Sequence, residues 1–248
     1  MARAREICEC LEQLAPKDLA ESWDNVGLLV DCGAEVTSVL VALDITDEVV
    51  AEAELQGCQL IVAHHPVIFK PLRTLARRDV AFRLVKKNIS AICMHTNLDA
   101  AEGGVNDVLA RLFEVENPEP FGEAGVGRVG SVEPTDAKTL AALCQSRLNA
   151  HVKLADAGKP IRRLALIGGS GGSMLADAAA TGADALLTGE ASHHDAIDAR
   201  AMGLSLIVAG HYSTEFPIVP VLADHLSRRF NGLRVICSRR NKDPFSYL

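Results

Sequence analysis

Three short motifs in the sequence contain histidines, and two of them also contain a carboxylate; these are the side chains that commonly hold divalent metal ions. They are His64-His65-Pro66, His95-Thr96-Asn97-Leu98-Asp99 and Gly210-His211-Tyr212-Ser213-Thr214-Glu215. Each motif directly follows a short, strongly apolar run. Such runs are typical of buried strands, and open α/β sheets bind ligands just beyond the carboxyl ends of their strands.

Each motif also has a plainer explanation. Two adjacent imidazoles separate widely on extended backbone, so His64 and His65 can serve two metals, but they can equally belong to a surface loop. Asp99 can be a hard oxygen ligand or the cap of a helix. Glu215 follows His211 by four positions, which lets both side chains converge, yet a carboxylate there is also favourable at a helix N-terminus.

Taken together, the motifs supply the ligand chemistry for a pair of divalent ions such as Zn, Mn or Fe. The ligand set is His64, His65, Asp99, His211 and Glu215. Five side chains leave coordination positions of two ions to water, and a metal ion lowers the pKa of a bound water toward neutrality. The motifs therefore favour hydrolysis over redox chemistry or group transfer.

The positions of apolar residues predict the alternating strands and helices of an α/β fold. We expect helices at residues 4–14, 47–55, 78–87, 105–113, 139–148, 174–180 and 194–202, and a further helix ending near 229. We expect strands at residues 26–30, 38–43, 59–63, 90–94, 151–154, 164–167, 185–187, 206–208 and 233–237.

A segment rich in Pro and Gly, residues 116–130, predicts a boundary between two lobes, 1–120 and 121–248. The run Leu-Ile-Val-Ala occurs once in each lobe, and superimposing the two copies aligns His65 with His211. The two lobes are therefore expected to be related.

Two further glycine-containing segments follow predicted strands. Residues 168–173, GGSGGS, lack the spacing of a phosphate-binding loop and predict a tight turn with close packing. Residues 189–195 contain Glu190, His193 and His194, which we expect to surround the site without providing its main ligands.

The composition narrows the class of protein. There are 25 Lys and Arg against 32 Asp and Glu, a formal net charge of −7, and no basic run with interleaved aromatics. This disfavours nucleic acid as a partner. The seven cysteines include no C-x-x-C pair, the N-terminal residues are charged, and no apolar run reaches membrane-spanning length. We expect a cytoplasmic protein that does not enter membranes.

The motifs resemble those of the NIF-three-like dinuclear metal-binding family, also known as GTP cyclohydrolase I type 2-like proteins. The resemblance extends over essentially the whole chain. It includes Trp23-Asp24-Asn25-Val26-Gly27-Leu28, Ala63-His64-His65-Pro66, the motif from His95 to Asp99, Gly189-Glu190 with His193-His194, the motif ending at Glu215, and the C-terminal Asp243-Pro244-Phe245-Ser246-Tyr247-Leu248.

The resemblance implies two α/β lobes facing each other across a dinuclear metal site. It also implies that the metal ligands are the five residues of the ligand set given above, and that Glu215 or Asp99 bridges the two ions. It also implies a homohexameric ring. Some relatives carry an inserted domain, but residues 116–130 are too short to contain one.

For function, the resemblance implies a metal-bound water that attacks a nucleotide such as GTP and opens its purine ring. His95 would be the catalytic proton shuttle, and His193 and His194 would contact the substrate. Lys70 and Arg73 are the nearest basic residues for a triphosphate. Two alternatives use the same ligands without turnover, namely a metal storage or delivery protein and a scaffold that metals hold together.

Overall fold

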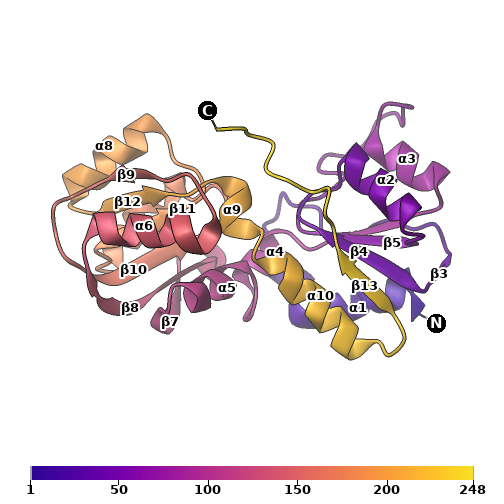
Figure 1. Cartoon of the computed structure of the whole chain (residues 1–248), viewed down its shortest axis with the longest axis horizontal. Helices are drawn as coiled ribbons and strands as arrows, with labels where there is room; N and C mark the ends of the chain where they lie inside the picture. Colours follow the sequence, from indigo (N-terminus) through magenta and orange to yellow (C-terminus); the bar gives the residue numbers. More distant parts are fainter. Residues whose placement is uncertain (1, 248) are drawn as a thin grey trace. The chain divides into compact units, whose positions relative to one another are not determined.

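The computed structural model describes residues 2–247 and divides the chain into two compact units (Figure 1). Unit 1 consists of residues 2–98 together with Ile218–Lys242, and unit 2 consists of Asp99–Pro217 together with residues 243–247. The chain therefore leaves unit 1 after Leu98 and returns to it at Ile218. Both units are α/β, as the sequence predicts.

Unit 1 is built on a five-stranded sheet in the order β13-β4-β5-β6-β2, in which only the pairing of β2 with β6 is antiparallel. Its strands are β2 (Gly27–Val30), β4 (Ser38–Ala42), β5 (Leu60–Ala63), β6 (Ser90–Cys93) and β13 (Arg234–Cys237). A separate two-stranded pairing joins β1 (Ala2–Arg3) to β3 (Glu35–Val36). Every residue of β4, β5 and β6 is buried, as expected for strands covered on both faces.

Helices cover both faces of this sheet. Contacts place α1 (Ala4–Leu14) against β2 and β6 and α10 (Ile218–Arg229) against β4 and β13, while α2 (Asp47–Leu55) and α3 (Val80–Lys86) pack against each other and against the same sheet. Leu40, Ile61 and Ala91 join α2 and α3 in one apolar core. The hydroxyl of Thr46 begins α2 by accepting a hydrogen bond from the backbone N–H of Val49.

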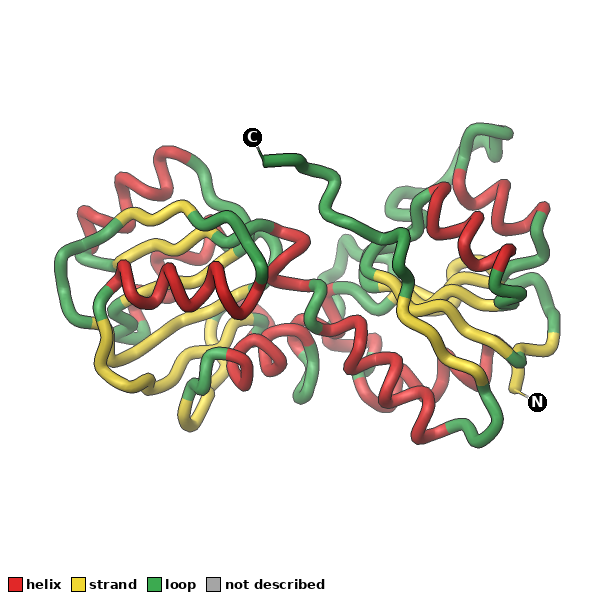
Figure 2. The backbone as a smooth tube through the Cα atoms, viewed as in Figure 1, coloured by secondary structure: helices red, strands yellow, loops and turns green. Residues whose placement is uncertain are grey.

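Unit 2 is built on a six-stranded sheet in the order β7-β8-β10-β11-β12-β9. Its strands are β7 (Glu116–Phe121), β8 (Gly127–Thr135), β9 (Lys153–Ala155), β10 (Ile161–Ile167), β11 (Ala185–Thr188) and β12 (Ser205–Val208). The three central strands β10, β11 and β12 are parallel, and the outer pairings are antiparallel. Figure 2 shows the strands of each unit, in yellow, lying side by side.

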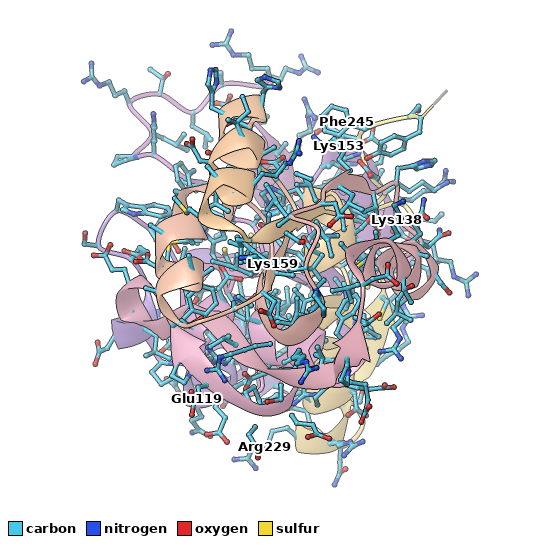
Figure 3. All side chains as sticks on the ribbon, turned by 90° about the vertical axis from the view of Figure 1, so that its left-hand side faces the viewer. Glu119, Lys138, Lys153, Lys159, Arg229 and Phe245 are labelled. Carbon is cyan, nitrogen blue, oxygen red and sulfur yellow. The ribbon has the colours of Figure 1, made fainter. Side chains whose placement is uncertain are left out.

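Two apolar cores flank the sheet of unit 2. One includes side chains of α5 (Val105–Leu112) and α6 (Ala137–Leu148), and the other includes side chains of α7 (Leu175–Ala180) and α8 (His193–Met202). Ser192 and Asp195 form a capping box that begins α8. At the sheet edge, Glu119 of β7, which Figure 3 labels, pairs with Arg163 of β10.

The two halves of the chain repeat one topology. The first runs α1-β2-β4-α2-β5-α3-β6 and the second runs α6-β9-β10-α7-β11-α8-β12, each with an antiparallel edge strand beside its last parallel strand. In this repeat β6 corresponds to β12, so His95 and Asp99 correspond to His211 and Glu215. The alignment of His65 with His211 from the Leu-Ile-Val-Ala echo is therefore wrong, because β5 corresponds to β11.

The structure divides the chain differently from the lobes 1–120 and 121–248 expected from the sequence. Residues 116–130 do not lie at the boundary between the units but contain β7 and the start of β8. Glycines allow this pairing: a Cβ on Gly127 would lie 2.3 Å from the Phe121 ring, and one on Gly130 would lie 2.4 Å from the Glu116 carbonyl oxygen. The last helix of each half of the chain belongs to the unit built mainly from the other half: α5 belongs to unit 2, and α10 belongs to unit 1.

Candidate metal centre

Three histidines meet at the carboxyl ends of two neighbouring strands of unit 1. His64 and His65 follow β5, and His95 follows β6. The ring centroids are 4.9 Å apart for His64 and His65, 5.3 Å for His64 and His95, and 5.5 Å for His65 and His95. One nitrogen atom from each ring lies within 4.8 Å of the chosen nitrogen of the other two rings. At this spacing the three nitrogens can hold a metal ion.

An oxygen acceptor orients each of these rings through Nδ1. The pairs are His64 with the Met94 carbonyl at 2.8 Å, His65 with Asp44 Oδ1 at 2.7 Å, and His95 with Asp24 Oδ1 at 2.9 Å. A hydrogen-bond acceptor at Nδ1 keeps the ring proton on Nδ1. In the neutral ring, Nε2 is then unprotonated and has a lone pair available for a metal ion. Histidines that ligate metals are typically held in this way, so the donor set fits a divalent transition ion.

Asp24 is the most constrained of these acceptors, because its side chain has no exposed surface. Burial alone would raise the pKa of this carboxyl, but the hydrogen bonds from His95 and Thr96 outweigh burial and hold the pKa well below its usual range. Asp24 is therefore ionised at neutral pH and presents a fixed negative charge to the His95 ring.

In unit 2, a histidine and two carboxylates meet after β11 and β12. His211 begins α9 (His211–Glu215), and its Nε2 lies 3.1 Å from Glu215 Oε2. On the other side of the ring, Nδ1 lies 3.4 Å from Glu190 Oε2. Glu215 is 4% exposed. The nitrogen of His211 and an oxygen of Glu215 are thus close enough to bind the same ion, with Glu190 on the outer side of the ring.

Glycines make room for this pair. Gly169 has φ +62°, and a Cβ there would lie 2.2 Å from Glu215 Oε1 and 3.3 Å from His211 Nε2. A Cβ on Gly189 would lie 2.8 Å from the Cα of His211. The prediction that residues 168–173 form a tight turn with close packing is confirmed, and at Gly169 the turn packs against the His211–Glu215 pair.

The remaining predicted site residues lie as follows. Asp99 is partly buried in α4 (Thr96–Ala100), is the first residue of unit 2, and its backbone carbonyl accepts a hydrogen bond from Asn106. His193 and His194 are exposed in the first turn of α8, and among residues 2–247 neither belongs to a group with metal-ligand spacing. Their contact with a substrate stays a prediction.

For two residues of the site the sequence predicted no role, although Asp24 is part of the motif Trp23–Leu28 that resembles the family. Asp44 follows β4 at the same sheet edge as the three histidines, so its position after a buried strand was a usable signal. Asp24 lies in a loop before β2, where no strand-end argument applies. Its role follows only from the contacts that it makes in the fold.

The fold and the site define an α/β protein with histidines and carboxylates grouped at the strand ends. Residues 2–244 match the model of the family Duf34/NIF3 (NGG1p interacting factor 3). The chain belongs to this family. Among residues 2–247, no helix is long and apolar enough to cross a membrane.

Relatives and solved structures agree with this assignment. A GTP cyclohydrolase 1 type 2 homolog of Clostridium perfringens is 34% identical over 99% of this chain and 100% of that protein. One of Streptomyces coelicolor is 37% identical over 99% of this chain and 94% of its own length. The Staphylococcus aureus protein SA1388 has a similar structure, with a TM-score of 0.88, 32% identity and complete coverage of both chains.

Proposed function

We propose that this protein is a dinuclear, divalent-metal-dependent hydrolase of the GTP cyclohydrolase I type 2 kind. Its metal ligands are His64, His65, Asp99, His211 and Glu215. The observation that carries the proposal is the pair His64 and His65 in unit 1, each held at Nδ1 by an oxygen acceptor, with ligand nitrogens within 4.8 Å of each other. When bound, two such ions supply an acidified water and polarise the reacting bond.

The side chains of the site have separate roles. Asp44 holds the His65 ring in place and raises the basicity of its Nε2. Glu190 does the same for His211, and Gly169 leaves the space that the Glu215 carboxylate occupies. His95, held by the ionised Asp24, exchanges a proton with the substrate at Nε2.

The substrate is a nucleotide or a related small molecule, with GTP as the first candidate. The names of the relatives support this choice. Lys70 and Arg73, exposed in the loop after His64-His65-Pro66, provide positive charge for the phosphates. His193 and His194 contribute further substrate contacts from the exposed start of α8.

The test combines metal analysis with an activity screen. The purified protein should carry close to two divalent ions per chain, and Asp99→Ala and His211→Ala should each lose a large part of them. His151→Ala, which removes an exposed histidine outside the predicted ligand set, is the matched control and should keep its metal. Full metal content in both ligand variants would show that the metals bind elsewhere.

Activity is then measured against nucleotides, phosphoesters and cyclic amides. His95→Gln should lower the rate while the metal is retained, and chelator-treated protein should be inactive. Equal rates for metal-free and metal-loaded protein would disprove the mechanism. Full loading with no turnover of any compound would instead favour a metal storage or delivery protein.

A further inference from the structure

Beside the three histidines of unit 1 lies a pair of exposed aromatic rings. The side chain of Trp23, the single tryptophan of the chain, is 57% exposed, and that of Phe69 is 45% exposed. Their ring centroids are 5.7 Å apart with an angle of 57° between the planes. Aromatic residues make up only 4% of this chain, so two exposed rings in contact are a distinctive feature of its surface.

Both rings also contact His95. The centroid of Trp23 lies 6.2 Å from that of His95 in an edge-on arrangement, and the centroid of Phe69 lies 6.3 Å from it with planes at 80°. The pair is therefore adjacent to the imidazole cluster. A planar molecule lying on the pair would have its edge close to His95.

The loops that carry the two rings are held firmly. The side chain of Asp24, next to Trp23, has no exposed surface and accepts hydrogen bonds from His95 and Thr96. The side chain of Asn25 donates a hydrogen bond of 2.5 Å to the carbonyl oxygen of Ile68, which precedes Phe69. The backbone on each side of the pair is thus fixed while the rings stay exposed, so little conformational entropy is lost when a ligand stacks on them.

We propose that Trp23 and Phe69 form a stacking platform for a planar heteroaromatic ring. This proposal rests on the proposed function, because it identifies the nucleobase as the part of the substrate that is bound here. At an angle of 57°, one ring stacks face to face with the ligand while the other meets its edge, and both arrangements are favourable for π-systems. Stacking of bases on exposed aromatic side chains tolerates any base, because every base has a π-face. The occupant is therefore a planar nucleobase, and the proposed function makes a purine the base to test.

Trp23 itself reports on this proposal. As the only tryptophan, it accounts for the indole fluorescence of the protein. Guanosine, which has no phosphate, is titrated into the full-length protein as purified and into the same protein after chelator treatment. Saturable quenching of the Trp23 emission in both samples is expected. Because neither phosphate nor bound metal is needed, failure of the metal mechanism would leave this result unchanged.

Variants locate the binding. Phe69→Leu keeps an apolar side chain without the ring and should weaken guanosine binding about tenfold. Phe82→Leu removes a phenyl ring on α3 of the same unit and should bind as the wild type does. By calorimetry, Trp23→Leu should also lose about tenfold, whereas Trp23→Phe should recover most of the affinity.

Two results would overturn the proposal. One is the absence of saturable quenching, and the other is a Phe69→Leu variant that binds guanosine as tightly as the wild type. In the second case, light scattering could also show a smaller mass for this variant. That result would identify the ring pair as a contact between copies of the chain.

Discussion

The side-chain amide of Asn241 donates a hydrogen bond of 3.2 Å to Asp44 Oδ2, although 197 positions separate the two residues. The amide oxygen of Asn241 accepts hydrogen bonds from the backbone N–H groups of Leu43 and Asp44 at 2.6 Å and 3.1 Å. The other carboxylate oxygen of Asp44 accepts from His65 Nδ1. The segment after β13 therefore fixes both the turn after β4 and the ring of a proposed metal ligand.

This relationship predicts the effect of Asp44→Asn. The amide keeps the size of the side chain but removes the negative charge beside His65, so Nε2 becomes a poorer ligand. We expect metal affinity to fall about 10–100-fold with the fold retained. Competition with a chromophoric chelator measures this affinity, and Asp18→Asn, a charge-neutralising change at an exposed position, should leave it unchanged. Equal affinities for wild type and Asp44→Asn would contradict the role of Asp44.

Much of the site was predictable because of a rule about sheets. His64, His65 and His95 follow neighbouring strands of one sheet whose apolar composition is visible in the sequence, and the carboxyl ends of parallel strands lie at one edge of a sheet. Residues that follow buried strands therefore gather without any knowledge of the fold. Asp24 escapes this rule, because its position depends on a loop whose path is decided by hydrogen bonds to His95 and Thr96.

The division into units was not predictable in the same way. The expected helices 47–55 and 4–14 match α2 and α1, since helical periodicity is local information. Which sheet a helix packs against is a tertiary property, and α5 and α10 each join the unit of the other half. The Pro and Gly content of residues 116–130 predicted a boundary between lobes, but proline is tolerated in an edge strand, and β7, which contains Pro118 and Pro120, is at the edge of its sheet.

A second prediction concerns the close approach of Gly169 to Glu215. Gly169→Ala places a methyl group 2.2 Å from the present position of Glu215 Oε1 and adds the strain of a left-handed backbone. The buried carboxylate must move, so we expect unfolding free energy to fall by about 3 kcal/mol and metal affinity to fall about tenfold or more. Denaturant unfolding and metal analysis measure the two effects.

Gly158→Ala provides the matched control for this change. Gly158 also has a positive φ of +72°, but no atom lies within 4 Å of the position that its new methyl group would occupy, so only backbone strain is added. It should cost about 1–2 kcal/mol and leave metal binding intact. If both alanine variants lose the same amount of stability and of bound metal, the close approach of Gly169 to Glu215 does not affect metal binding.

A third prediction is a homo-oligomer larger than a dimer, with a hexamer as the expected form. Several large apolar side chains are exposed in the single chain, including Leu55 at 81% and Val85 at 54%, and association of copies would remove such surface from water. Light scattering should give six times the chain mass of 26.4 kDa. A monomeric mass at micromolar concentration would contradict this assembly.

The last prediction concerns acid stability through Glu52 on α2. Burial alone would raise the pKa of this carboxyl, but hydrogen bonds from the Ser238 hydroxyl and from the backbone N–H groups of Arg239 and Arg240 outweigh burial and lower the pKa below its ordinary 4.5. The ionised form is thus bound more strongly in the folded state. Its contribution to stability is complete above the unfolded pKa and is lost as the pH falls through the lower, folded pKa.

Glu52→Gln should therefore lower the free energy of unfolding by about 1 kcal/mol at neutral pH, a modest effect because the group is only partly buried. The difference from wild type should shrink as the pH falls below 4.5 and vanish once the wild-type carboxyl is protonated in both states. Urea unfolding of metal-free protein at a series of pH values measures this difference. Glu9→Gln, at an exposed position of α1, should show no comparable loss at neutral pH. A gap between Glu52→Gln and wild type that stays constant across the acid range would mean that the charge of Glu52 does not hold the segment after β13 in place.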